Sequence, residues 1–144
     1  MKHAQATQTT KASDIQRAWH QIDVKDKTLG RVASEIAQLL MGKGKPQFVR
    51  NLDCGDFVVV TNAKFVKVTG NKEIQKKYYR HSGYPGGFRV TSLKELRGTK
   101  PQMIVTHAVK GMLPQNKLRD RMLKRLIVSE GEEHKYQDKF SVKS

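Results

Sequence analysis

Apolar residues recur with a helical period between residues 29 and 40, the strongest pattern in the chain. Thr28 is the predicted N-cap of this helix, which is predicted to end where Gly42, Gly44 and Pro46 follow. The spacing i, i+3, i+4, i+7, i+8, i+10 and i+11 places one apolar face along the helix. That face consists of Leu29, Val32, Ala33, Ile36, Ala37, Leu39 and Leu40.

Two candidate strands flank the helix. Residues 18–24 carry Trp19 and Ile22 among polar neighbours and have the length of a strand. Residues 57–60 are consecutive β-formers without polar alternation, which is typical of a strand covered on both faces in a parallel sheet. Strand, amphipathic helix and buried strand in this order predict a right-handed βαβ unit.

Shorter elements follow the second strand. Residues 65–68 are a short apolar stretch, and a turn is predicted at 69–72, where a glycine and an asparagine tolerate positive φ. Residues 76–81 predict an exposed strand. Residues 81–87, HSGYPGG, predict a loop because glycine and proline prevent regular structure.

Helices dominate the pattern after this loop. Residues 92–97 predict about two turns, ended by Gly98. Thr99 and Pro101 predict the cap and first turn of a longer helix that reaches Met112.

A basic helix is predicted directly after Pro114, which has no N–H and ends the preceding helix. Asn116 is its predicted N-cap, and residues 126–128 predict a last short strand. Three cations at i, i+4 and i+7 form a stripe beside an apolar one. They are Lys117, Arg121 and Lys124.

The net positive charge of the chain indicates a class of binding partner. The chain has 28 Lys and Arg against 13 Asp and Glu, a net charge of +15 and a pI of about 10.1. Solubility needs a net charge of only about 2 to 8, so the excess predicts a polyanionic partner, with nucleic acid as the leading candidate. A membrane surface is disfavoured as the partner, because no long stretch is cationic and amphipathic enough to lie in the interface. No apolar run reaches about 18 residues, so no bilayer-spanning segment is expected. Cys54 is the only cysteine, which agrees with a reducing compartment.

A length of 144 residues corresponds to one domain. Residues 1–15 are polar and predict a flexible N-terminal extension. Residues 16–130 form the predicted α/β RNA-binding domain. Residues 131–144 form a polar C-terminal tail, and the segment from residue 130 onward is expected to be disordered when unbound.

The sequence gives little support for a catalytic site or a metal site. The GKGK segment at 42–45 is not a phosphate-binding P-loop, and the five histidines show no ligand spacing. Asp53 and Asp56 are the only hint of a metal-dependent nuclease, and we expect them instead at a solvated start of the strand. Cys54 is expected to be a small buried residue. We therefore predict no enzyme, no metal and no cofactor.

Five ordered motifs resemble a known family. They are KTLGR at 27–31, DCGDFVVVTN at 53–62, VTGNK at 68–72, HSGYPGG at 81–87 and HAVKGMLP at 107–114. From about Trp19 to His134 the chain resembles the bacterial-type large-subunit ribosomal protein thirteen family. The resemblance implies a compact α/β fold around a mainly parallel sheet of about four strands. It also implies binding to large-subunit ribosomal RNA and an early place in subunit assembly.

The sequence departs from the family pattern after the basic helix. A Tyr-x-Gly type ending is expected there, whereas this chain has Ser129, Glu130 and Gly131 followed by two glutamates. Family members often carry a glycine near Arg119, where this chain reads NKLRDR. RNA contacts of the C-terminal tail are therefore not transferred. The join at Gly111 is expected to pack closely and to set the angle of the basic helix.

Charge clusters and matching motifs together define the candidate RNA-binding residues. Tyr78, Tyr79 and Tyr84 lie among the basic residues, where aromatic rings can stack on unpaired bases as RNA binders often do. For Tyr78 and Tyr79, packing of the ring into the core is an equal alternative. The candidates are Lys43, Lys45, Arg50, Lys64, Lys67, Gly70, Asn71, Lys72, Lys76, Lys77, Arg80, His81, Ser82, Gly83, Tyr84, Gly86, Gly87, Lys110, Gly111, Met112, Pro114, Lys117, Arg121, Lys124 and Arg125.

The expected function is that of a structural, RNA-binding protein of the large ribosomal subunit. Its expected partners are ribosomal RNA and neighbouring large-subunit proteins, without a membrane, a small-molecule substrate or an obligate homo-oligomer. The expected location is the cytoplasmic ribosome, or an organellar one. Two alternatives remain open at this point: a free RNA-binding regulator of translation, and a metal-dependent nuclease.

Overall fold

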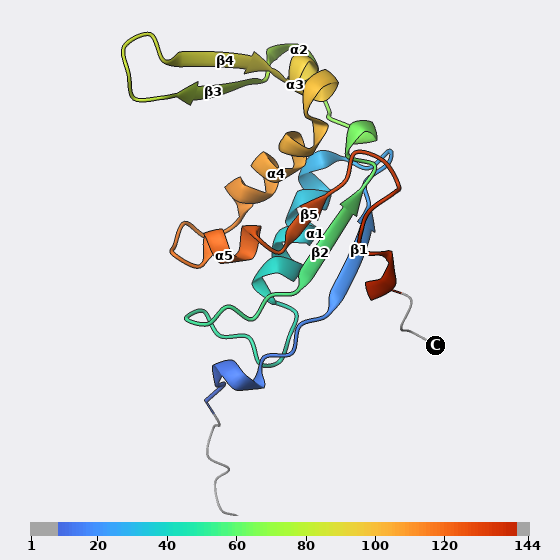
Figure 1. Ribbon diagram of the computed structural model, residues 1–144, viewed down its shortest axis with the longest axis vertical. Coiled ribbons are helices and arrows are strands. Elements are labelled where there is room, and N and C mark those ends of the chain that lie inside the picture. Colours follow the sequence, from blue (N-terminus) through green and yellow to red (C-terminus); the bar gives the residue numbers. More distant parts are fainter. Residues whose placement is uncertain (1–8, 141–144) are drawn as a thin grey trace, which may run out of the picture.

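A three-stranded parallel sheet forms the centre of the computed structural model, which describes residues 9–140 (Figure 1). Its strand order is β1 (Trp19–Asp23), β2 (Phe57–Thr61) and β5 (Leu126–Val128). The β1–β2 pairing sets Trp19 opposite Phe57. Residues 58–60 of the central strand are fully buried, as the unbroken apolar run predicts.

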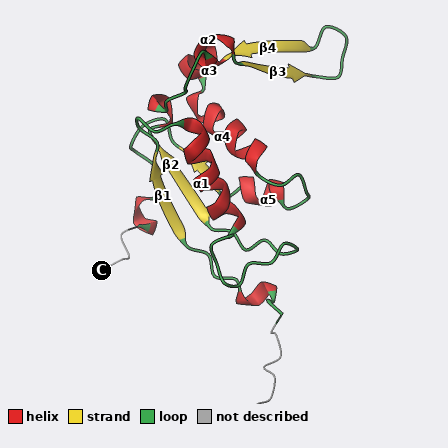
Figure 2. Ribbon diagram, turned by 180° about the vertical axis from the view of Figure 1, so that it is seen from behind, coloured by secondary structure: helices red, strands yellow, loops and turns green. Residues whose placement is uncertain are grey.

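Helix α1 (Leu29–Met41) connects β1 to β2 and covers one face of the sheet (Figure 2). Its apolar face is buried as predicted, and the helix ends at Gly42, whose φ of 74° is left-handed. Thr28 stands at the N-cap position, but its side chain makes no capping bond. The N–H of Leu29 instead donates to the carbonyl of Lys67. The predicted βαβ unit is confirmed.

The longer C-terminal helix, α4 (Pro101–Met112), lies beside α1 and buries Ile104, Val105 and Val109 (Figure 2). It is preceded by α3 (Leu93–Thr99), so Thr99 belongs to α3 rather than capping α4. None of the described helices is long and apolar enough to cross a membrane.

The predicted basic helix is much shorter than expected. Helix α5 (Arg119–Leu123) has five residues, and Lys117 precedes it. The side-chain oxygen of Asn116 accepts hydrogen bonds from the N–H groups of Leu118 and Arg119 in the turn before α5. The N-cap position of α5 is Leu118, however, and not Asn116 as predicted. The three predicted cations therefore do not share one regular helix.

Two further strands form a separate antiparallel hairpin. Strands β3 (Lys77–His81) and β4 (Phe88–Ser92) follow the short α2 (Lys72–Gln75), and the hairpin projects from the body (Figure 1). The exposed strand and the loop at 81–87 are confirmed, whereas β4 was not predicted. The α/β class with a helix-flanked parallel sheet is also confirmed, although the sheet has three strands.

The C-terminal segment packs against the sheet. The ring of Trp19 stacks on Phe57 and on Tyr136, with centroid distances of 4.4 Å and 5.4 Å. It also meets Phe140 edge-on, with a centroid distance of 6.3 Å. Three-residue 3-10 helices lie at Ala12–Asp14, Ala63–Phe65 and Gln137–Lys139. The expected disorder is therefore wrong for residues 131–140, because aromatic side chains fasten them. Residues 1–8 and 141–144 of the two predicted tails lie outside the described residues.

Candidate nucleic-acid interface

Three basic segments lie along one edge of the molecule, opposite β1 and the C-terminal segment (Figures 1 and 2). We call residues 43–50, 76–89 and 110–124 the cationic edge. The ring of Tyr78 in β3 lies 5.2 Å from that of His107 in α4, which joins the hairpin to the helix. Side chains of residues 41–52 and 114–122 line one shared hollow, which brings the other two segments together.

The cations of this edge lack acidic partners. Within residues 9–140, the ion pairs involve Arg17, His20, Lys45, Lys67, Arg97 and Arg125. The remaining cations of the edge form no ion pair with a described carboxylate, and all except Arg119 are exposed. They are Lys43, Arg50, Lys76, Lys77, Arg80, Arg89, Lys110, Lys117, Arg119, Arg121 and Lys124.

The base of the hairpin is fixed to the body by Arg97 of α3. Its guanidinium binds Glu73 through two 3.0 Å hydrogen bonds, and it also donates to the carbonyls of Lys64 and Val66. Leu93, directly after β4, is fully buried, and its N–H donates to the carbonyl of Lys76. The tip of the hairpin is therefore free while its root is held.

The surroundings of His107 in α4 lower its pKa. Partial desolvation of this exposed residue is the largest cause, and the charges of Lys110 and Lys76 add to it. Burial raises the pKa of Tyr78, whose ring is half-buried against His107 and lies 5.5 Å below the ammonium of Lys76. Tyr78 thus takes the packing role, while Tyr79 is 69% exposed.

The hollow between the loop and the α4–α5 join has an apolar floor and a basic rim. It measures about 330 Å³. Its lining includes Lys43 and Arg50, and its apolar residues are Met41, Phe48, Leu52, Pro114 and Met122. The join identified from sequence is therefore one wall of a surface depression.

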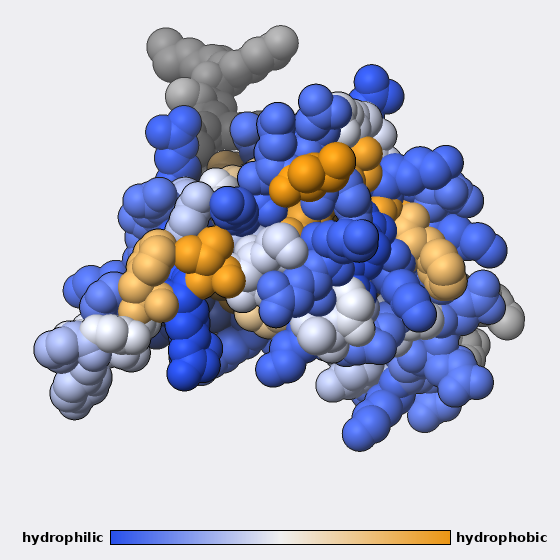
Figure 3. Space-filling model, turned by 90° about the horizontal axis from the view of Figure 1, so that it is seen from above, coloured by the Kyte–Doolittle hydropathy of each residue, from blue (hydrophilic) through white to orange (hydrophobic). Residues whose placement is uncertain are grey.

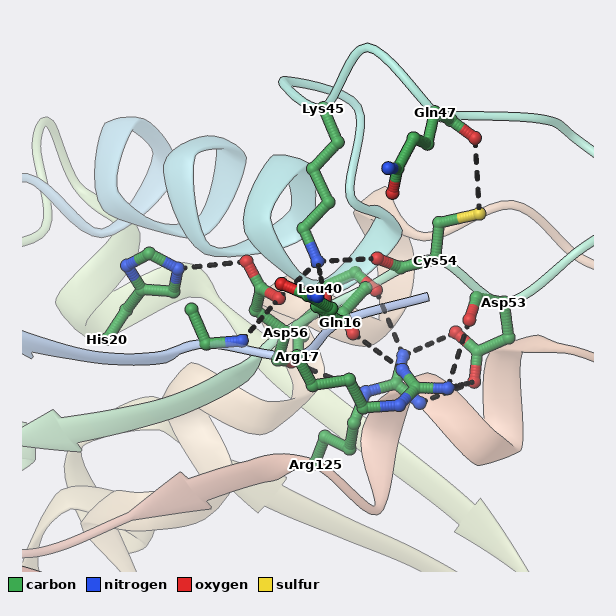
Figure 4. A network of polar contacts seen from close by, with 12 residues as sticks. Gln16, Arg17, His20, Leu40, Lys45, Gln47, Asp53, Cys54, Asp56 and Arg125 are labelled. Atoms are coloured by element: carbon green, nitrogen blue, oxygen red, sulfur yellow. Dashed lines mark hydrogen bonds and ion pairs between the residues drawn. The ribbon is translucent and has the colours of Figure 1, made fainter. Parts of the chain in front are cut away.

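Beneath this edge, a buried ion network ties the loop before β2 to the residue before β5 (Figure 4). Arg125 is only 7% exposed, forms a two-pronged ion pair with Asp53 and donates to the carbonyl of Leu40 at 3.1 Å. Arg17 approaches Asp53 at 3.6 Å and donates to the carbonyl of Gly55 at 2.5 Å. These contacts hold three chain segments at the N-terminal end of β2.

Asp56 is the second centre of the network. It accepts hydrogen bonds from the Lys45 ammonium at 2.5 Å and the Ala18 N–H at 2.9 Å, and its other oxygen lies 2.9 Å from Nε2 of His20. Burial raises the pKa of Asp56, but these hydrogen bonds outweigh it and leave the pKa below 3.8. Asp56 is therefore a buried anion paired with a partly buried cation.

The network bears on three interpretations made from the sequence. Asp53 and Asp56 do not lie at a solvated start of the strand, since both are partly or fully buried and ion-paired. Lys45 and Arg125 were predicted among the RNA-binding cations, but their charged ends are engaged inside the protein. The carboxylates already bind lysine and arginine, so they leave the nuclease alternative without support. Cys54 is buried, as predicted.

Other predicted residues are placed outside the cationic edge or within its turns. Lys67 pairs with Asp26 at 3.0 Å on the surface near α2, away from α5. Gly70, Gly83 and Gly86 have positive φ, which explains the glycines at these turns. The expected close packing at Gly111 is wrong, because an added Cβ would meet nothing within 4 Å.

Sequence reasoning missed Arg89 and Phe88, which the hairpin brings opposite Arg80 and His81. The missed signal is a period of two over residues 88–92, FRVTS, directly after a glycine-rich turn.

The sequence comparisons now bear on this geometry. Residues 17–135 match the model of the family described as ribosomal protein L13. This chain belongs to the ribosomal protein L13 family. The match spans the sheet, the hairpin, the cationic edge and the C-terminal segment up to residue 135, and the resemblance stated from the motifs is confirmed.

Bacterial relatives match nearly the whole chain. The "Large ribosomal subunit protein uL13" of Dehalococcoides mccartyi (strain 195) is 61% identical over 128 residues, covering 89% of this chain and 90% of the relative. Proteins of the same name from Caldanaerobacter subterraneus subsp. tengcongensis and Parafrankia sp. are each 53% identical, covering 88% and 91% of this chain and 89% of each relative. Family membership, rather than any missing feature, identifies this chain as a ribosomal protein and not an enzyme.

Proposed function

We propose that this protein is a structural component of the large ribosomal subunit and binds ribosomal RNA through its cationic edge. One observation carries the proposal: the exposed cations of the edge have no carboxylate partners among the described residues. Such unscreened positive charge destabilises the free protein by self-repulsion and is neutralised by phosphates.

The separation of charge along the molecule supports this orientation. Asp120 is the only carboxylate within residues 74–94 and 107–128, whereas Glu130, Glu132, Glu133 and Asp138 gather in the C-terminal segment. That segment lies on the opposite side, against Trp19 of β1 (Figure 1). A polyanion is therefore attracted more strongly to the cationic edge than to the C-terminal segment.

The mechanism combines counterion release with recognition of shape. Each phosphate neutralised by Lys or Arg releases condensed cations, which gives affinity without sequence information. The glycine turns at the hairpin tip allow close approach of an RNA backbone, and shape-specific contact of this kind is usual for folded RNA. The proposal includes an early place in subunit assembly, contacts to neighbouring ribosomal proteins and a location in the cytoplasmic ribosome.

Binding to a transcript of large-subunit ribosomal RNA tests the proposal. Six to ten phosphate contacts predict a loss of affinity of roughly 10³- to 10⁵-fold between 50 and 200 mM salt. Arg121→Glu is expected to weaken binding without unfolding the protein, because Arg121 is exposed. Lys135→Glu makes the same charge change in the C-terminal segment and is the matched control. Affinity independent of salt, or equal effects of the two variants, would refute the proposed interface.

Sedimentation of cell extract tests ribosomal membership separately. The protein is expected to travel with the large subunit. A wholly soluble distribution would favour the free regulator instead.

A further inference from the structure

The β3–β4 hairpin presents two chemically different faces, because side chains alternate along each strand. The register places Tyr79 opposite Val90 and His81 opposite Phe88 on one side. It places Arg80 opposite Arg89 on the other. We call these the aromatic face and the arginine face.

The arginine face carries two like charges at directly opposed positions. Such a pair is unfavourable in a sheet, and no described carboxylate pairs with either residue. Arg80, Arg89, Ser82 and Gly87 line a hollow of about 230 Å³. Two guanidinium groups beside a small polar hollow match a phosphate, which accepts paired N–H donors.

The aromatic face is exposed in the free protein. Tyr79 is 69%, Phe88 59% and Val90 43% exposed. The ring centroids of Tyr79 and Phe88 lie 6.0 Å apart with the ring planes within 15° of parallel, and we call this exposed stacked pair the Tyr79–Phe88 platform. Figure 3 shows the hairpin projecting at the left, with a small apolar group surrounded by hydrophilic residues.

We propose that the hairpin binds RNA on both faces at once: Arg80 and Arg89 hold a phosphate, and the Tyr79–Phe88 platform stacks on an unpaired base. This inference rests on the proposed function and specifies the ligand chemistry of one part of the cationic edge. The hairpin then acts as a ribbon inserted between two RNA segments.

Charge favours RNA over a protein as the occupant of the aromatic face. Residues 74–94 contain no Asp or Glu, and the exposed Lys77 lies on the aromatic face itself. Stacking on aromatic side chains tolerates any base, since every base has a π-face, and cations beside the platform hold the adjoining backbone. An exposed aromatic pair with cations on both sides of the ribbon therefore matches a nucleotide chain.

Two double variants separate the two faces in binding assays with the large-subunit ribosomal RNA transcript. Arg80→Gln with Arg89→Gln is expected to weaken binding and to reduce the slope of log affinity against log salt by about 0.7 to 0.9, the value for one phosphate contact. Tyr79→Ala with Phe88→Ala is expected to weaken binding roughly 5- to 150-fold per stacked base while leaving that slope unchanged. Arg31→Gln and Phe65→Ala, exposed residues outside the hairpin, are the matched controls. Both double variants are expected to keep the thermal midpoint, because all four side chains are exposed.

The outcomes distinguish the inference from the proposed function. If Arg121→Glu weakens binding but both hairpin variants bind like the controls, the hairpin inference is wrong and the proposed function stands. If the aromatic variant binds the transcript normally yet fails to enter the large subunit, the aromatic face contacts a protein and the stacking inference is wrong. If neither Arg121→Glu nor the hairpin variants weaken binding, the proposed function itself fails.

Discussion

Replacing Arg125 with methionine is expected to destabilise the fold, although a basic residue near α5 looks from sequence like an RNA contact. The guanidinium is 7% exposed and spans Asp53 and the carbonyls of Leu40 and Asp56. Methionine replaces most of the aliphatic stem but supplies no donor. Asp53, whose side chain is 11% exposed, would keep only Arg17 at 3.6 Å as a charged partner.

The expected loss is about 3 to 5 kcal/mol of unfolding free energy, the range for removing one member of a buried ion pair. The lower end is expected, because Arg17 and solvent partly compensate Asp53. Domains of this kind have total stabilities of roughly 5 to 15 kcal/mol, so the variant loses a large share.

Urea unfolding followed by circular dichroism measures this loss. Arg121→Met is the control, since Arg121 is exposed and its replacement is expected to stay within about 0.5 kcal/mol of the parent. Asp53→Asn with Arg125→Met closes a double-mutant cycle, and the double variant is expected to lose about 0.5 to 3 kcal/mol less than the sum of the single losses. An Arg125→Met variant as stable as Arg121→Met, or strictly additive losses, would show that the pair does not hold these segments together.

Four further substitutions test the packing, the ion network and the C-terminal segment. Gly55→Ala is expected to cost about 3 kcal/mol or more in thermal or urea unfolding, since its Cβ would lie 1.6 Å from a carbonyl oxygen of α1. Gly111→Ala, in open space within α4, should be neutral or stabilising by up to about 1 kcal/mol, and a large loss there would contradict the packing described. The pKa of Asp56 is lowered from 3.8, so its carboxylate stabilises the fold fully above that pH and progressively less as the pH falls through the folded-state pKa. Asp56→Asn should therefore flatten the dependence of the unfolding free energy on pH below about pH 4. An unchanged pH dependence would contradict this role of Asp56. Tyr136→Ala should shift the emission of Trp19, the only tryptophan, to the red and cost at least about 0.5 to 1.5 kcal/mol, whereas unchanged emission would mean that the C-terminal segment does not cover the ring.

Elements with a strong local period were predicted well. The helical spacing of apolar residues places α1 within one residue of its observed bounds, and Pro101 marks the start of α4. The apolar run of β2 and its burial also follow from local pattern. In each case the spacing of apolar residues within one short segment defines the face to be buried, and any compact fold must cover that face.

Elements that depend on distant partners were predicted poorly. Strand β4 is short, exposed and defined by its pairing with β3, so its own pattern is weak. Residues 131–140 read as a polar tail because the partner that orders Tyr136 and Phe140 is Trp19, more than 100 positions earlier in the chain.

The sequence by itself determined the class of fold, the excess of positive charge and the family, because these depend on composition, local period and ordered motifs. Only the tertiary structure decided which cations remain available. Lys45 and Arg125 look like Lys43 and Arg121 in sequence, yet the first two are held by Asp56 and Asp53 and the other two form no ion pair among the described residues. Whether a charged side chain forms an ion pair depends on which residues folding brings within a few ångströms of it, and the local sequence does not determine that distance.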